Sequence, residues 1–152
     1  MLHYNTIPES PTQVHVEITP HCNLACGFCP VHKMKRGEPL TRDQILDVLS
    51  QACDMHPEYV DFVNYNEPLT CKDFWTYAAL VTSRLGHGHL GVVTNGTVMT
   101  EEIAFRLISL GLRQLVFSID AVSAETYARV RPRHAPDGPR EAASRAARGA
   151  AE

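Results

Sequence analysis

The chain contains four segments with strand-like hydrophobic patterns, each followed by a segment with a helix-like pattern. The predicted strands lie at residues 14–19, 59–65, 89–94 and 114–120. In residues 14–19 apolar and polar side chains alternate, which is the period-two pattern of a β-strand. After each strand, apolar residues recur three and four positions apart, as they do on one face of an α-helix. The pattern therefore predicts a strand followed by a helix, four times over.

Capping signals mark the beginning of each predicted helix. Thr41 and Gln44 have the spacing of a capping box, in which each side chain bonds the backbone N–H of the other residue. The segment Thr70–Asp73 has a similar pattern before the second helix. The third and fourth helices are predicted to begin after Thr100 and Ser123.

This alternation predicts the fold class. No two predicted strands follow one another directly, and strands separated by helices form parallel sheets through right-handed crossovers. The four units between residues 14 and 130 average about 29 residues, close to the roughly 31 of a complete eight-unit β/α barrel. We therefore expect an α/β fold consisting of a partial parallel β/α barrel with about four βα units.

Composition and charge exclude several classes of protein. The chain has 14 basic and 17 acidic residues, whereas nucleic-acid binding through phosphate neutralisation needs a basic excess. No apolar run approaches the ~18 residues of a membrane span, and residues 1–10 lack the regions of a signal peptide. The five cysteines fit free or metal-bound thiols in a reducing compartment. We therefore expect a cytoplasmic protein with no nucleic-acid partner and no membrane partner.

The end of the chain differs in composition from the rest. After Val130, the final 22 residues contain no Val, Ile, Leu, Met, Phe, Trp, Tyr or Cys. A segment without large apolar side chains cannot offset its ordering entropy by burial. We therefore divide the chain into a body of residues 1–130 and an Ala-, Arg- and Pro-rich tail of residues 131–152 outside the core.

Three cysteines lie close together after the first predicted strand. Cys22, Cys26 and Cys29 have the spacing C-x3-C-x2-C at the carboxyl end of a parallel strand, where α/β folds place their chemistry. Thiolates are soft ligands, so three of them can converge on an iron–sulfur cluster. The spacing alone leaves open a group of structural thiols or a zinc site, which needs a fourth ligand. The candidates for that ligand are His21, His32, Cys53 and Cys71.

The segment EITPHCNLACGFCP resembles the cluster loop of radical S-adenosylmethionine (SAM) enzymes. The family follows its second strand with a Gly-Gly-Glu-Pro-like turn, and Tyr65–Pro68 keeps Glu-Pro but replaces both glycines. The segments Thr94–Thr97, Phe117–Asp120 and Ala121–Tyr127 are similar to later signatures of the family, in the same order. The resemblance covers about residues 12–132. It is nearest to the peptide-modifying, SPASM-type branch and the molybdenum-cofactor cyclase branch.

The resemblance implies the cofactors and the reaction. Cys22, Cys26 and Cys29 would bind three irons of a [4Fe–4S] cluster, and the fourth iron would bind the methionine end of SAM. An electron from an external flavodoxin- or ferredoxin-like donor would cleave SAM and release a 5′-deoxyadenosyl radical. This radical would abstract hydrogen from a peptide or small-molecule substrate, which the sequence does not identify. We assign no catalytic residue of the chain itself.

The resemblance also implies which residues contact SAM. Phe28 would lie near the adenine, and the turn at residues 66–68 would present carbonyls or a carboxylate to the ammonium of SAM. Ser118 would touch the ribose or the carboxylate, and Asp120 would face cofactor or substrate. Residues 94–95 we interpret as turn formers rather than ligands. The implied SAM contacts are Phe28, Asn66, Glu67, Pro68, Ser118 and Asp120.

The chain departs from the family after its fourth unit. Radical SAM cores usually have six strand–helix units, whereas residues 131–152 stand here in place of the fifth. We therefore expect a truncated or frameshifted gene product, or a fragment that another chain completes. The alternative function is a non-catalytic module that holds structural zinc or an iron–sulfur cluster, or an inactive truncated product.

Overall fold

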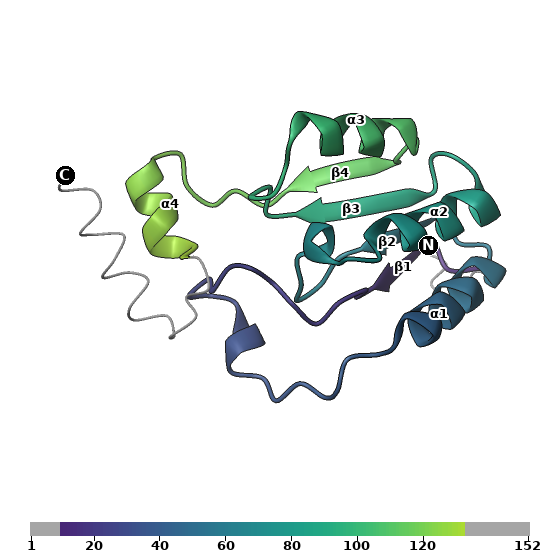
Figure 1. Ribbon diagram of the computed structural model, residues 1–152, viewed down its shortest axis with the longest axis horizontal. Helices are drawn as coiled ribbons and strands as arrows, with labels where there is room; N and C mark the ends of the chain where they lie inside the picture. The colour runs from purple at the N-terminus through teal and green to yellow at the C-terminus, as the bar shows by residue number, and fades with distance from the viewer. Residues whose placement is uncertain (1–9, 133–152) are drawn as a thin grey trace, which may run out of the picture.

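The fold is a parallel sheet whose strands lie side by side in the order of the sequence. The computed structural model describes residues 10–132. The strands are β1 (Gln13–Val16), β2 (Tyr59–Phe62), β3 (Leu90–Thr94) and β4 (Gln114–Phe117). The sheet order is β1-β2-β3-β4, and all three strand pairs are parallel, as the arrows of Figure 1 show. The predicted α/β fold class is confirmed.

Each strand is followed by a helix, as predicted. The helices are α1 (Arg42–Asp54), α2 (Phe74–Leu85), α3 (Glu101–Ser109) and α4 (Ala124–Val130). Two short 3-10 turns, η1 (Pro30–His32) and η2 (Pro68–Thr70), lie in the connections after β1 and β2. Figure 1 shows α4 beyond the arrowheads of the strands, away from the other three helices. The carboxyl ends of the strands therefore face α4.

The helix starts agree with the capping signals except at α2. Thr41 and Gln44 form both bonds of the capping box, at 2.8 and 3.3 Å, and the predicted caps of α3 and α4 also form. The box expected at the start of α2 is wrong, because Asp73 precedes the helix without a side-chain capping bond. Its carboxylate instead pairs with Arg42 at 3.4 Å, and Thr70 belongs to η2.

The core lies between one face of the sheet and the helices α1, α2 and α3. Phe62 and Phe74 are both buried and meet edge to face, with ring centroids 5.8 Å apart. Leu107 brings α3 into the same core. Burial of such apolar side chains is the main stabilising contribution to a domain of this size. The other apolar side chains of this core that have no exposed surface are Leu49, Val60, Ala78, Val81, Leu90 and Val92.

The opposite face of the sheet carries a row of polar side chains. The strand register aligns His15, Asp61, Gly91 and Gln114 across the four strands. The buried Asp61 carboxylate accepts hydrogen bonds from the side-chain amides of Gln13 and Gln114, the latter at 3.1 Å. A Cβ on Gly91 would lie 1.6 Å from Asp61 Oδ1, so only glycine leaves room for this carboxylate. One buried carboxylate therefore ties β2 to both β1 and β4.

Two residues at the start of the predicted tail contact the rest of the protein. Arg131 is 8% exposed, and the carbonyl of Pro132 accepts a hydrogen bond of 2.7 Å from the N–H of Ala25. Composition places both residues in the predicted tail, because composition alone does not record contacts with a distant loop. The first two residues of the predicted tail thus contact the cysteine loop and the cavity beside it, and the rest of the predicted tail lies outside the described residues.

Candidate functional site: a cysteine-lined cavity

A cavity of about 150 Å³ lies at the carboxyl ends of the strands. The loop of residues 20–30, here called the cysteine loop, forms one wall, and the connections after β2 and β3 form another. The cavity is named the cysteine cavity because all three loop cysteines line it. The other predicted site residues that line it are Phe28, Asn66, Glu67 and Ser118. Pro68 and Asp120 do not line it; Pro68 begins η2 and Asp120 pairs with a neighbouring arginine.

The three thiols are free and face one space. Cys26 is buried, and Cys22 and Cys29 are partly buried. Burial raises the pKa of the Cys22 and Cys26 thiols, and the positive charge of Arg131 partly offsets this effect on the pKa of Cys26. Binding of a soft metal centre at these thiols would therefore release protons. Within residues 10–132, no three His, Cys, Asp or Glu side chains are arranged to hold a single metal ion.

The two other cysteines lie away from the cavity, as expected. Cys53 is buried on α1, in the core. Cys71 follows η2, and its thiol lies 3.6 Å from the carbonyl oxygen of Ile18, to which it donates. Burial raises the pKa of both thiols. Neither has a thiol aimed at the cysteine cavity.

Glu67 fixes the turn after β2 by bonding three separate segments. Its buried carboxylate accepts hydrogen bonds from the hydroxyl of Thr94 at 2.7 Å and from the backbone N–H of Asn95 at 2.6 Å. It also accepts a bond of 3.2 Å from the N–H of Leu69. The N–H of Glu67 donates to the carbonyl of His21, in the cysteine loop, at 2.9 Å. The side chain therefore supports the cavity wall rather than projecting an uncommitted carboxylate into the cavity.

Asn66 brings a polar group without a partner to the cavity. Both polar atoms of its side-chain amide are buried, and neither has a hydrogen-bond partner within the described chain. Buried amides normally find partners, since an unsatisfied one costs about 1–3 kcal/mol. This amide is therefore suited to a polar ligand in the cavity.

Asn95 contributes to the site although the sequence indicated only a turn. Its side-chain amide donates to the side-chain oxygen of Asn23 at 2.8 Å and lies 3.9 Å from the Cys22 sulfur. Its own oxygen accepts from the N–H of Thr97 at 2.9 Å, which makes an Asx turn in a segment where the sequence predicts a turn. The same residue thus makes the turn and contacts the cysteine loop.

Arg131 is the second residue that the sequence did not assign to the site. It lines the cysteine cavity, forms an ion pair with Asp120 and places its guanidinium 5.4 Å from the centre of the Phe28 ring. Phe28 is itself 60% exposed. Asp120 therefore acts on the cavity through Arg131 instead of lining it.

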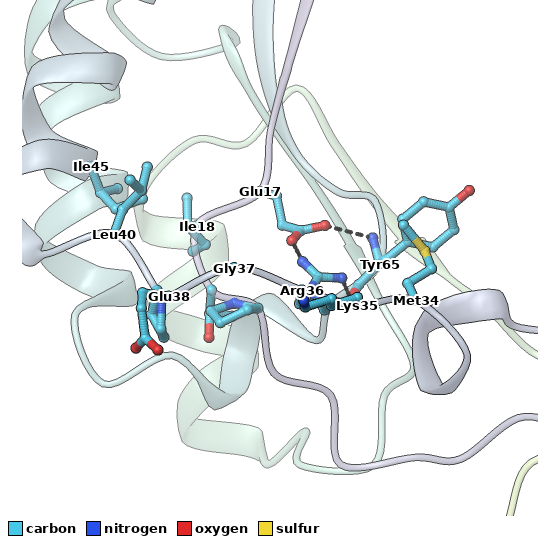
Figure 2. Close-up of a pocket in the computed structure, with 13 residues that line it drawn as sticks. Glu17, Ile18, Met34, Lys35, Arg36, Gly37, Glu38, Leu40, Ile45 and Tyr65 are labelled. Atoms are coloured by element: carbon cyan, nitrogen blue, oxygen red, sulfur yellow. Dashed lines mark hydrogen bonds and ion pairs between the residues drawn. The ribbon is translucent and has the colours of Figure 1, made fainter.

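A second, larger cavity of about 430 Å³ is lined by Glu17, Arg36 and Tyr65, among other residues (Figure 2). Glu17 forms an ion pair with Arg36 and accepts a hydrogen bond of 3.0 Å from the N–H of Tyr65. Arg36 also donates to the carbonyl of Tyr65 at 3.3 Å. These bonds fasten the chain that follows the cysteine loop to the ends of β1 and β2. Tyr65 lines both cavities, so the second cavity adjoins the site.

The fold and the site together define a class of protein. A parallel β/α sheet that gathers three free thiols and a buried acidic turn at its carboxyl edge is typical of a barrel-type, cofactor-binding α/β protein. The family model described as the radical SAM superfamily matches residues 16–149. The chain belongs to the radical SAM superfamily, and the resemblance inferred from its motifs is confirmed.

Curated relatives agree with this assignment. The chain is 33% identical over 127 residues to the mycofactocin maturase MftC of Mycobacterium tuberculosis, covering 81% of this chain and 31% of that protein. It is 27% identical over 118 residues to the GTP 3′,8-cyclase of Geobacter sulfurreducens, covering 75% of this chain and 36% of that protein. The chain therefore spans about a third of the length of these relatives, which are enzymes.

Solved structures share the fold. BtrN in complex with AdoMet and 2-DOIA matches with a TM-score of 0.67 and 23% identity, over 82% of this chain and 52% of that chain. Native anSMEcpe with bound AdoMet matches with a TM-score of 0.61 and 18% identity, over 90% of this chain and 39% of that chain. No helix within residues 10–132 is long and apolar enough to cross a membrane.

Proposed function

We propose that Cys22, Cys26 and Cys29 hold a [4Fe–4S] cluster and that the cysteine cavity receives SAM. The observation that carries this proposal is the convergence of three free thiols and an unpartnered buried amide on one cavity. When bound, the cluster supplies the electron that cleaves SAM to a 5′-deoxyadenosyl radical, which abstracts hydrogen from the substrate. The chain is then the cofactor-binding part of a radical SAM enzyme.

The residues of this chain would bind and orient SAM rather than perform the chemistry. The amide of Asn66 can donate to a carboxylate and accept from an ammonium, which are the polar groups of a methionine moiety. Glu67 holds the turn that carries Asn66, through its bonds to Thr94 and Asn95. Phe28 offers an apolar ring to the adenine, and Ser118 offers a hydroxyl at the end of β4. Pro68 shapes the turn without lining the cavity.

The partners follow from the same proposal. The cluster would need an external electron donor of the flavodoxin or ferredoxin type. The relatives include a mycofactocin maturase and a GTP cyclase, and this range supports a peptide or a small molecule as the proposed substrate class. All five cysteines are free in the structure, which supports a reducing, cytoplasmic location for this protein.

Anaerobic reconstitution of the 152-residue chain with iron and sulfide tests the proposal. We expect about four irons per chain, lost in Cys22→Ala, Cys26→Ala and Cys29→Ala because each removes a thiolate ligand. Cys53→Ala and Cys71→Ala are the matched controls and should keep the iron, since their thiols lie away from the cavity. Adding SAM to the reduced protein should change its electron paramagnetic resonance (EPR) spectrum.

Two outcomes would contradict the proposal. Full iron loading of the Cys26→Ala variant would show that the cysteine loop does not hold the cluster. A stable, colourless protein that binds zinc and accepts no cluster would identify the chain as a structural zinc module instead.

A further inference from the structure

The function proposed above leaves one buried charge at the cysteine cavity unused. Arg131 is 8% exposed and lies at the C-terminal end of α4, the helix that stands apart from the sheet in Figure 1. Its guanidinium contacts the Asp120 carboxylate, whose side chain is 40% exposed, and the Phe28 ring. Within the described residues its ion pair is with this half-exposed carboxylate, and a buried guanidinium paired in this way keeps much of its field inside the cavity.

Two backbone hydrogen bonds hold Arg131 opposite Cys26. The N–H of Ala25 donates to the carbonyl of Pro132 at 2.7 Å, and the N–H of Gly27 donates to the carbonyl of Val130 at 3.3 Å. The donors flank Cys26 and the acceptors flank Arg131, so the two residues face each other across a short paired segment. Both side chains line the same cavity.

We propose that Arg131 is a positioning residue that raises the reduction potential of the cluster held by the cysteine loop. The inference rests on the proposed cluster site and adds to it a determinant of potential. Reduction takes one electron from the reductant and adds one negative charge to the cluster, and a nearby buried cation stabilises that added charge. Asp120 opposes this effect, because its carboxylate partly neutralises the guanidinium. Glu67 is the other buried charge at the cavity and has the opposite sign.

The test is a dithionite titration of the reconstituted 152-residue chain, followed by EPR. Arg131→Gln should shift the midpoint to more negative potential, with a change of about tenfold in the reduction equilibrium, equal to about 59 mV for one electron. Arg131→Lys keeps the charge and should remain closer to the unaltered chain. Asp120→Asn should shift the midpoint in the opposite direction, because it frees the guanidinium of its counterion. Arg129→Gln is the matched control: it removes the same charge from an exposed position of α4 and should change nothing.

The outcomes separate this inference from the proposed function. If the unaltered chain assembles no cluster, the proposed function fails and this inference fails with it. If the cluster assembles but Arg131→Gln and Arg129→Gln have the same midpoint, only the role of Arg131 is overturned. If Arg131→Gln does not hold iron, Asp120→Asn decides: a positive shift supports the inference, and an unchanged or negative midpoint overturns it.

Discussion

The hydroxyl of Thr94 donates a buried hydrogen bond of 2.7 Å to the carboxylate of Glu67. The bond joins the last residue of β3 to the turn after β2, at the wall of the cysteine cavity. The carboxylate also accepts from the N–H of Asn95, and the N–H of Glu67 reaches the carbonyl of His21. One residue thus connects three segments that carry the site.

Replacing Glu67 should therefore lower both the free energy of unfolding and the affinity for SAM. Glu67→Ala leaves the donors of Leu69, Thr94 and Asn95 without their acceptor, and stranding a buried donor costs about 1–3 kcal/mol. We expect a loss of at least this size in the free energy of unfolding, measured by urea denaturation. Iron content should stay near that of the unaltered chain, because the thiols remain, whereas SAM binding to the reduced cluster should weaken.

The control for this prediction is Glu58→Ala. Glu58 is exposed and pairs with Arg113 at 3.5 Å, an interaction worth about 0–1 kcal/mol. If Glu67→Ala unfolds at the same urea concentration as Glu58→Ala, the bonds of Glu67 do not support the turn.

The second prediction concerns the row of polar residues on the face of the sheet opposite the core. Gly91→Ala places a Cβ 1.6 Å from Asp61 Oδ1, so the carboxylate must move from its bond with Gln114. Overpacking of this kind typically costs about 1–3 kcal/mol in the free energy of unfolding. Gly37→Ala is the control, because nothing lies within 4 Å of its added Cβ.

A double-mutant cycle would identify the cause of that loss. Asp61→Ala removes the atom with which the new methyl group collides, so the cost of Gly91→Ala should be smaller in the Asp61→Ala background than in the unaltered chain. Equal costs in both backgrounds would mean that the loss arises elsewhere in the backbone.

The third prediction concerns the support that the end of α4 gives to the cysteine loop, and two shortened chains test it. A chain ending at Pro132 keeps Arg131 and the carbonyl that receives the N–H of Ala25, whereas a chain ending at Val130 lacks both. We expect the chain ending at Pro132 to match the 152-residue chain in thermal unfolding and in iron content. The chain ending at Val130 should bind less iron, because its cysteine loop loses the bond from Ala25 to Pro132 and keeps only the longer bond from Gly27 to Val130. Identical iron content in the two shortened chains would show that this pairing does not support the loop.

The sequence predicted the features that depend on neighbouring residues. Short stretches of sequence determine the order of strands and helices, the capping box at Thr41 and the cysteine spacing. The structure has the strands, the helices and this cap at the expected places. Asp73 does not cap α2 as its local sequence predicts, because its carboxylate forms an ion pair with Arg42 of α1. Local patterns therefore failed where a contact from a distant element competed.

The same distinction separates the predicted site residues from the missed ones. Glu67 was expected at the cavity, but the direction of its carboxylate depends on how β2 and β3 pair, which no local motif records. Arg131 was missed because its surroundings in the sequence are poor in apolar residues, whereas its partners are Asp120 and the cysteine loop. Asn95 was recognised as a turn residue, and only the folded chain brings its amide to Asn23.

The order of the strands has a consequence for how the protein is made. β1 to β4 lie side by side in the order in which a ribosome produces them, so each unit can dock on the one before it as it emerges. The bond between Ala25, in the loop after β1, and Pro132, the last described residue, must close last. The cysteines are thus synthesised well before the residues that complete their cavity, which is finished only when the end of α4 arrives. A group held by all of these segments can therefore be enclosed only after the end of α4 has been synthesised.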